Sequence, residues 1–151
     1  MTTASRAKTI LLVEDNPNDE ALALRVLNKC GHGAEVVVAR DGAEALEFLF
    51  AEGRYAGRSG AALPTVTLLD LKLPKLDGLE VLRRIRADER TVLAPVVVLT
   101  SSDEQRDRLE SYRCGANSYV RKPEAFDAFS TALRGIAEYW LEVNEAPNGR
   151  V

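Results

Sequence analysis

The chain has 151 residues, a length that fits one domain and is too short for a multidomain enzyme. Its 20 basic and 23 acidic side chains give a net charge of −3, which argues against a general nucleic-acid binder, and 46% hydrophobic residues provide for a core. With no apolar run near the ~20 residues of a membrane helix, no signal-peptide cleavage site and two cysteines, we expect a cytoplasmic protein with reduced thiols.

Five short apolar or β-branched runs predict five strands. They cover residues 10–13, 36–39, 66–69, 96–99 and 119–120. Each run is too short for a helix, and the first four are continuously apolar, as in strands that are buried on both faces. A parallel sheet covered by helices is the arrangement that buries strands in this way.

Helical signals fill the intervals between these runs. Asn16 and Pro17 are typical of a helix start, and Asp41 with Glu44 has the spacing of a capping box. The predicted helices cover residues 17–30, the segment after Asp41, 78–88, 103–113 and about 126–143. Strands that alternate with helices predict an α/β fold with a parallel sheet and helices on both of its faces.

One interval is longer than a compact fold needs. Residues 51–64 contain three glycines and a proline and predict a mobile surface loop in preference to a dedicated site. The expected organisation is a short lead at 1–7, one domain at 8–143 and a flexible tail at 144–151.

Polar residues follow the predicted strands at their carboxyl ends. Glu14 and Asp15 follow the first strand, Asp70 the third, Thr100 the fourth and Lys122 the fifth. Ligands of an open parallel sheet bind outside this edge, so these side chains are expected to converge. Any one of them alone is better explained as a helix cap, but their joint occurrence favours a binding site.

The predicted cluster has the chemistry of a phosphoryl and metal site. Crowded carboxylates repel one another unless a cation neutralises them, and oxygen ligands without His or Cys select Mg²⁺. A lysine and a hydroxyl are suitable donors to phosphoryl oxygens. A carboxylate can itself be the nucleophile and form an aspartyl phosphate.

Four ordered motifs identify a family resemblance. They are ILLVEDN at 10–16, LDLKLPKLDG at 69–78, VVLTS at 97–101 and GANSYVRKP at 115–123. With them, residues from about 8 to 136 resemble the CheY-like receiver domain of bacterial two-component response regulators. The resemblance implies a flavodoxin-like fold of five parallel strands in the order 2-1-3-4-5 with five helices on two faces.

The resemblance also assigns roles, with a sensor histidine kinase as the phosphoryl donor. Asp70 is then the phosphoacceptor, Thr100 bonds to the phosphoryl group and Lys122 pairs with it. Asp15 and Asp70 hold Mg²⁺ directly, Glu14 mainly through water, and the Lys72 backbone carbonyl completes the protein ligands. Tyr119 matches the aromatic switch residue that moves together with Thr100, and Pro123 matches a residue that follows a cis peptide bond.

A narrower resemblance is to regulators that are paired with phytochrome-type histidine kinases, such as a bacteriophytochrome. It implies a homodimer formed through the fourth helix, the fifth strand and the fifth helix. The stripe of Phe126, Phe129 and Trp140 serves either this interface or the core, and the core is preferred for most of it. Tyr139 and Trp140, late in the helix, are better candidates for the interface.

Other polar residues have simpler interpretations. We expect His32 to be a solvated loop residue, and Arg83, Arg84 and Arg86 to line a solvated helix face. No basic recognition helix follows the receiver-like part, so direct nucleic-acid binding is not expected, and no membrane contact is expected either.

The sequence therefore predicts a phosphoacceptor switch and not an enzyme. One alternative is a dimeric binding module that phosphorylation does not control, against which the complete acidic, Thr and Lys set argues. Another is a Mg²⁺-dependent phosphatase of the haloacid dehalogenase class. That class needs a second Asp two residues after the first, where this chain has Lys72.

Overall fold

A computed structural model describes residues 8–58 and 62–147 of the chain. The strands are β1 (Thr9–Val13), β2 (Glu35–Ala39), β3 (Val66–Leu69), β4 (Val96–Thr100) and β5 (Ser118–Arg121). The helices are α1 (Pro17–Cys30), α2 (Gly42–Phe50), α3 (Gly78–Ala87), α4 (Gln105–Arg113) and α5 (Phe126–Glu138). Strands and helices alternate along the described chain, as the sequence predicts.

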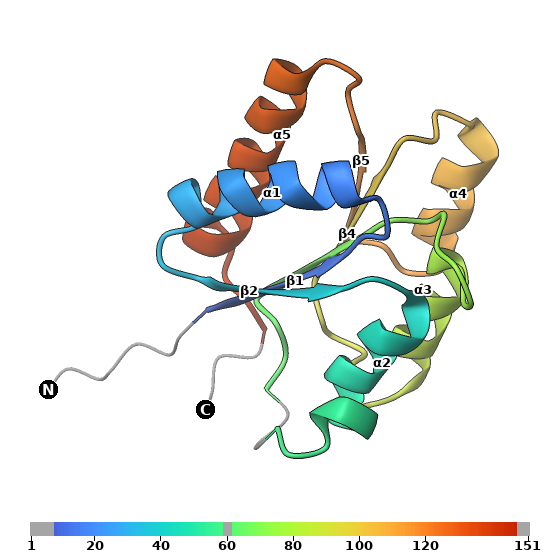
Figure 1. The fold of residues 1–151 in the computed structure, drawn as a ribbon. Coiled ribbons are helices and arrows are strands. Elements are labelled where there is room, and N and C mark those ends of the chain that lie inside the picture. The colour runs from blue at the N-terminus through green and yellow to red at the C-terminus, as the bar shows by residue number, and fades with distance from the viewer. Residues whose placement is uncertain (1–7, 59–61, 148–151) are drawn as a thin grey trace, which may run out of the picture.

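The five strands form one parallel sheet in the order β2-β1-β3-β4-β5. This confirms the predicted strand order. The helices α1 and α5 lie together on one face, and α2, α3 and α4 lie on the other (Figure 1). In register, Val13 lies opposite Leu69, and Leu69 lies opposite Val98, so the central strands end at the same edge.

Alternation along the strands divides the core between the two faces of the sheet. Ile10 and Leu12 of β1 point toward α1 and α5, where Leu133 is fully buried. Leu11 and Val13 point toward α2 and α3, where Val81 and the adjacent Leu82 are also fully buried. The continuously apolar strands are therefore buried on both faces, because helices cover both.

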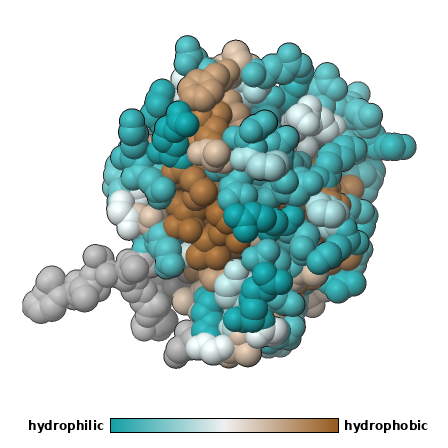
Figure 2. Space-filling model, in the orientation of Figure 1, coloured by the Kyte–Doolittle hydropathy of each residue, from teal (hydrophilic) through white to brown (hydrophobic). Residues whose placement is uncertain are grey.

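The edge strand β2 departs from this pattern. Its residues Val36, Val37 and Val38 are only half-buried, because β2 has a strand neighbour on one side alone. Figure 2 shows an apolar strip across the middle of the face on which β2 lies, bordered by hydrophilic residues. The prediction of full burial is thus wrong for this strand.

Three helices begin with a side-chain cap at the carboxyl edge of the sheet. Asn16 accepts hydrogen bonds from the amides of Asn18 and Asp19, and so fixes the first turn of α1. Asp41 and Asp77 cap α2 and α3 in the same way. These caps satisfy amides that have no partner within the helix, and they aim the helix N-termini at that edge.

The long loop before β3 is anchored to α2 over the part that the structure describes. A 3₁₀ turn at Gly53–Tyr55 packs the Tyr55 ring edge-on against Phe48, with ring centroids 5.1 Å apart. The Arg58 guanidinium lies 4.0 Å from the centroid of the same Phe48 ring. These contacts hold the described part of the loop against α2, and the mobility of the loop stays a prediction. Residues 59–61 of the loop lie outside the described residues.

The last helix continues as a π-helical turn at Tyr139–Val143, and Leu141 in this turn is buried. Phe129 belongs to the core and Trp140 packs against it. Phe126, in contrast, has 55% of its surface exposed, because it starts α5 beside a cavity. The preferred core assignment is therefore wrong for Phe126. The predicted lead at 1–7 and residues 148–151 of the predicted tail at 144–151 lie outside the described residues.

Among the polar residues that were expected to be solvated, Arg83 and Arg84 are exposed, whereas the expectation for Arg86 is wrong. Arg86 is half-buried and donates to the carbonyl oxygens of Val92, Ala94 and Gly115 and to the side chain of Asn117. Arg86 turns toward the segments before β4 and β5, which helical periodicity alone does not reveal. His32 is exposed in a turn, which confirms the expectation for it, and its two ring nitrogens lie 3.3 Å and 3.5 Å from carboxylate oxygens of Glu138 and Glu142.

No helix among the described residues has the length and apolar character needed to cross a membrane.

Candidate functional site

The carboxyl edge of the sheet collects the side chains that the strand ends predict. Glu14 and Asp70 follow the paired residues Val13 and Leu69, and the Asp70 amide donates to the Val13 carbonyl oxygen at 3.1 Å. The Lys122 amide donates to the Thr100 carbonyl oxygen at 2.7 Å. Backbone pairing thus places all these residues in one region, as the sequence predicts.

Three carboxylates of this edge can approach one cation together. One oxygen each from Glu14, Asp15 and Asp70 lies within 4.8 Å of the others. Glu14 and Asp70 are buried, whereas Asp15 is exposed. An oxygen-only donor set that is open on one side fits a hard divalent ion that keeps water in its shell. The Lys72 amide donates to Asp70 Oδ1 at 3.3 Å, which brings the backbone of Lys72 close to the same carboxylate.

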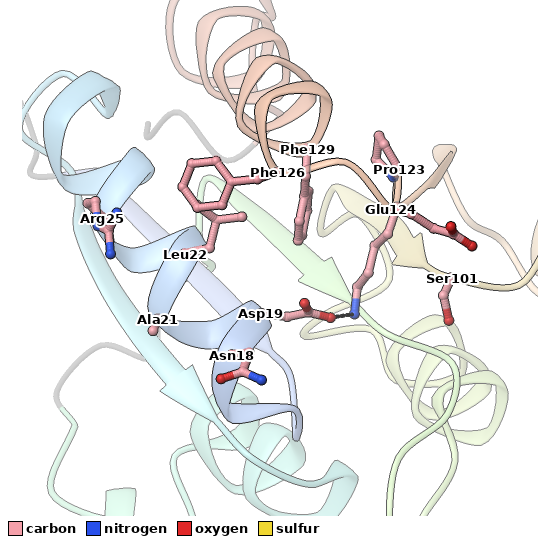
Figure 3. Close-up of a pocket in the computed structure, with 11 residues that line it drawn as sticks. Asn18, Asp19, Ala21, Leu22, Arg25, Ser101, Pro123, Glu124, Phe126 and Phe129 are labelled. Carbon is pink, nitrogen blue, oxygen red and sulfur yellow. Dashed lines mark hydrogen bonds and ion pairs between the residues drawn. The ribbon is translucent and has the colours of Figure 1, made fainter.

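Lys122 is the cationic centre of the cluster. Its buried ammonium group lies 2.7 Å from Glu14 Oε1 and 3.0 Å from Asp70 Oδ2. A third bond, of 2.9 Å, joins it to Asp19 Oδ2 (Figure 3). An ammonium group has three N–H donors, so these three carboxylates use all of them.

Asp19 is the site residue that the sequence analysis missed. It lies in the first turn of α1, and its carboxylate comes from a helix whereas the other acids come from strand ends. The sequence did contain one indication of this position. Asp19 comes three residues after the N-cap Asn16, so it lies in the first turn of α1, at the same edge of the sheet. Acids are common in first helical turns, so the signal by itself does not distinguish a ligand of Lys122 from a helix-stabilising charge.

Burial and ion pairing have opposite effects on the pKa values of Glu14 and Lys122. Burial raises the pKa of Glu14 to about 7, although the bond from Lys122 opposes this effect. Burial would lower the pKa of Lys122, but its bonds to Glu14 and Asp19 outweigh burial and raise that pKa above its ordinary value. Lys122 therefore stays charged, and Glu14 is the acid of the cluster that titrates near neutral pH.

A chain of contacts leads from Thr100 to Tyr119. Thr100 is fully buried, and its hydroxyl accepts a 3.4 Å hydrogen bond from the Ser102 amide. The Tyr119 hydroxyl donates to the Ser102 carbonyl oxygen at 3.0 Å. The Ser102 hydroxyl donates to Asp107 of α4 at 2.6 Å. The loop after β4 thus connects the predicted switch residues to a surface helix.

A cavity of about 540 Å³ opens beside Lys122, between α1 and α5. Asp19 and Leu22 form part of one wall, and Phe126 and Phe129 form part of the other (Figure 3). Pro123 also lines this cavity, and none of the described peptide bonds is cis. The expectation of a cis bond before Pro123 is therefore wrong.

The sequence and the fold have known relatives. Residues 10–134 match the family model described as the response regulator receiver domain. The probable methanogenesis regulatory protein FilR2 of Methanothrix harundinacea is 41% identical over 138 residues, which cover 91% of this chain and 86% of FilR2.

Solved structures of phytochrome-related regulators superimpose on the chain. The phosphorylated cyanobacterial phytochrome response regulator RcpA has 40% identity and a TM-score of 0.88, covering 95% of this chain and 100% of RcpA. The Mn²⁺-bound response regulator Rcp1, from Synechocystis, has 38% identity and a TM-score of 0.86, covering 93% and 99%. The bacteriophytochrome response regulator AtBRR has 46% identity and a TM-score of 0.75, covering 97% and 100%.

Proposed function

The chain belongs to the response regulator receiver family, and on that premise we propose that it is a signalling switch controlled by phosphorylation of Asp70. The observation that carries this proposal is the position of the Asp70 carboxylate. It is buried, lies 3.0 Å from the Lys122 ammonium and shares a cluster with Glu14 and Asp15. A buried carboxylate that bonds to a fixed cation and belongs to a divalent-ion site is suited to become an acyl phosphate.

The acidic cluster supports a Mg²⁺ requirement. Glu14, Asp15 and Asp70 would hold the ion, together with the Lys72 backbone carbonyl, and Rcp1 is a Mn²⁺-bound relative. When bound, the ion would neutralise the oxygens of the transferring phosphoryl group. Lys122 holds Asp70 in place through the 3.0 Å bond to Asp70 Oδ2. The Asp70 oxygen forms the new P–O bond, the P–N bond of a phosphohistidine donor breaks, and the imidazole leaves with the bonding electron pair.

Thr100 and Tyr119 are suited to transmit the change. We infer that the Thr100 hydroxyl turns to the phosphoryl oxygens and gives up its contact with the Ser102 amide. Tyr119 is half-buried and bonds to the same residue, so a movement of Ser102 alters the place of the Tyr119 ring. Phosphorylation would then shift the population between two arrangements of the face that carries α4 and β5.

The relatives support a histidine kinase as the partner. RcpA and AtBRR are phytochrome and bacteriophytochrome response regulators, so we propose that the kinase of this chain is of the phytochrome type. We further propose a homodimer through α4, β5 and α5. Leu109, Tyr112 and Tyr139 expose large apolar side chains on these segments, which favours an interface there. A cytoplasmic location stays a prediction.

The decisive experiment is an intact-mass measurement after incubation with Mg²⁺ and phosphoramidate. We expect one phosphoryl adduct on the wild-type chain. The variant Asp70→Asn should form none, and chelation of Mg²⁺ by EDTA should reduce the adduct strongly. Melting curves of Asp70→Asn establish that the variant is folded. An adduct that persists undiminished in Asp70→Asn would overturn the assignment, and sustained turnover of a phosphate ester would favour a phosphatase instead.

A further inference from the structure

Asp19 occupies a special place among the three carboxylates that bind Lys122. Glu14 and Asp70 have 3% and 9% of their side-chain surface exposed, whereas Asp19 has 29%. Asp19 also lines the cavity between α1 and α5, into which Figure 3 shows it pointing beside the Lys122 ammonium. Of the three acids that bind Lys122, Asp19 is therefore the one that a molecule entering the cavity meets first.

The local structure holds Asp19 in this place. Its backbone amide donates to the Asn16 side chain at 3.0 Å, which fixes the first turn of α1. Lys122 is buried and tied to β4 through its backbone amide, so the ammonium has little freedom to move away. The 2.9 Å bond thus joins two side chains whose backbones are both fixed.

This bond competes with a phosphoryl group for the same donor. Lys122 has no N–H left after its bonds to Glu14, Asp19 and Asp70. A phosphoryl group on Asp70 needs one of them. Asp19 Oδ2 and Asp70 Oδ2 both bond to the same nitrogen, so the charge of Asp19 lies close to the charge that the phosphoryl oxygens bring. At such short separations in a partly buried site, like charges repel appreciably.

On the basis of the proposed function, we propose that Asp19 is a positioning residue that holds Lys122 and disfavours phosphoryl donors of high negative charge. It keeps the ammonium aimed at Asp70 while the site is unphosphorylated. It also partly neutralises Lys122 and repels anionic donors that approach from the cavity. The repulsion between Asp19 and a phosphoryl donor grows with the negative charge of the donor. Asp19 therefore selects among donors and also orients Lys122.

Two small phosphoryl donors separate these effects. Near pH 7, acetyl phosphate carries two negative charges, whereas phosphoramidate, whose nitrogen is protonated, carries one net negative charge. With acetyl phosphate, an Asp70 oxygen bonds to phosphorus, the bond from phosphorus to the acetyl oxygen breaks, and acetate leaves with the electron pair. With phosphoramidate, the P–N bond breaks and ammonia leaves with the pair, because its nitrogen already carries the needed proton. Neither reaction needs a further reactant apart from Mg²⁺.

The test measures the initial rate of phosphoryl-adduct formation by intact mass for the full chain and for Asp19→Asn. Asparagine keeps the size of the side chain and an oxygen that accepts from Lys122, but it removes the charge. We expect the acetyl phosphate rate to rise about fivefold and the phosphoramidate rate to rise about twofold. Raising the salt concentration should shrink both increases, because salt screens the charge of partly exposed groups.

Two further variants serve as controls. Asp19→Glu keeps the charge and should retain the wild-type preference between the two donors. Asp127→Asn removes an exposed acid from the first turn of α5 that does not line the cavity, and should leave both rates unchanged. Melting temperatures establish that all three variants are folded.

The outcomes are distinguishable from a failure of the proposed function. If Asp70 is not the phosphoacceptor, the wild-type chain forms no adduct with either donor, or it forms one that Asp70→Asn leaves undiminished. If the adduct forms but Asp19→Asn leaves the ratio of the two rates unchanged, the charge of Asp19 does not select donors and the inference is wrong. A fall of both rates by the same factor would likewise overturn it, since it would show a structural role alone.

Discussion

At the scale of single residues, the site depends on one lysine shared by three acids. Lys122 is buried among Glu14, Asp19 and Asp70, so removing its charge would leave carboxylates without compensation. Glu14 is the most deeply buried of the three, and its raised pKa of about 7 makes it the group whose protonation changes near neutral pH.

This raised pKa predicts how the metal-free protein responds to pH. The folded form keeps the Glu14 proton up to about pH 7, whereas the unfolded chain releases it near the ordinary value of 4.5. Between these values the folded state binds more protons, so the contribution of Glu14 to stability falls as pH rises. From pH 5.5 to 7.5 we expect the contribution to decrease by at most about 2 kcal/mol.

The measurement is urea unfolding in EDTA at both pH values. The variant Glu14→Gln cannot titrate at this position, so the wild-type stability minus the variant stability isolates Glu14. That difference in the free energy of unfolding should be smaller at pH 7.5 than at pH 5.5. A difference that is constant with pH, or one that grows in favour of the wild type, would contradict the raised pKa.

At the scale of elements, Arg86 connects three segments around the end of the sheet opposite the site. From α3 it reaches the carbonyl oxygens of Val92 and Ala94 before β4, and that of Gly115 before β5. It also bonds to the Asn117 side chain, whose oxygen accepts from the Val96 amide at 2.8 Å. All four acceptors are neutral oxygen atoms, so the positive charge of Arg86 has no ion-pair partner among them. What the arrangement requires is the planar guanidinium group, whose several N–H donors point in different directions.

Replacing Arg86 by lysine should therefore destabilise the fold although the charge is kept. We expect a loss of about 1–3 kcal/mol, because a lysine cannot reach four acceptors in different directions. Chemical denaturation provides the measurement. Arg84→Lys is the matched control, since Arg84 only pairs with Glu80 on the exposed face and should change stability by about 0.5 kcal/mol or less. Equal losses in the two variants would contradict the assignment.

The start of α3 is coupled to the phosphoacceptor through Gly78. A Cβ atom on Gly78 would overlap the Asp70 carbonyl oxygen and approach the Cα of Leu71 to 2.7 Å. Both neighbours are backbone, so they have little freedom to yield. The segment after β3 therefore approaches α3 at a position where only glycine fits.

Gly78→Ala should consequently destabilise the protein by about 2 kcal/mol or more and slow adduct formation on Asp70. Thermal melts and the intact-mass assay measure the two effects. Gly135→Ala is the control, because a Cβ there meets open space and lies inside α5. Alanine at position 135 should stabilise by about 0.5–1 kcal/mol. A Gly78→Ala protein with unchanged stability would contradict the close approach.

At the scale of the whole molecule, the exposed apolar residues indicate where another copy would bind. A cavity between β5 and α5 is lined by Val120, Ile136 and Tyr139, and Tyr112 is exposed on the nearby α4. If the proposed homodimer forms through this face, the double variant Tyr112→Ala with Tyr139→Ala should shift the molar mass from two chains toward one in light scattering. Leu93→Ala, which removes a similarly exposed side chain before β4, should leave the mass unchanged. A dimer that survives the double variant would exclude this face.

The sequence by itself determined the α/β class, the strand order through its family motifs, and most of the site. The continuously apolar runs correctly predicted burial on both faces for β1, β3 and β4, although not for β2. The register of a parallel sheet brings Glu14, Asp70, Thr100 and Lys122 to one edge. The local pattern was sufficient for these features because backbone pairing alone enforces them.

The tertiary structure decided the contacts that side chains make between helices and distant segments. Asp19 reaches Lys122 across 103 positions of sequence, Arg86 turns into the molecule and away from solvent, and Phe126 faces a cavity and not the core. Helical periodicity states which residues share a face, but the neighbour opposite that face depends on how the helices pack. That packing comes from burying both faces of the sheet at once, so it emerges only when the whole chain is folded.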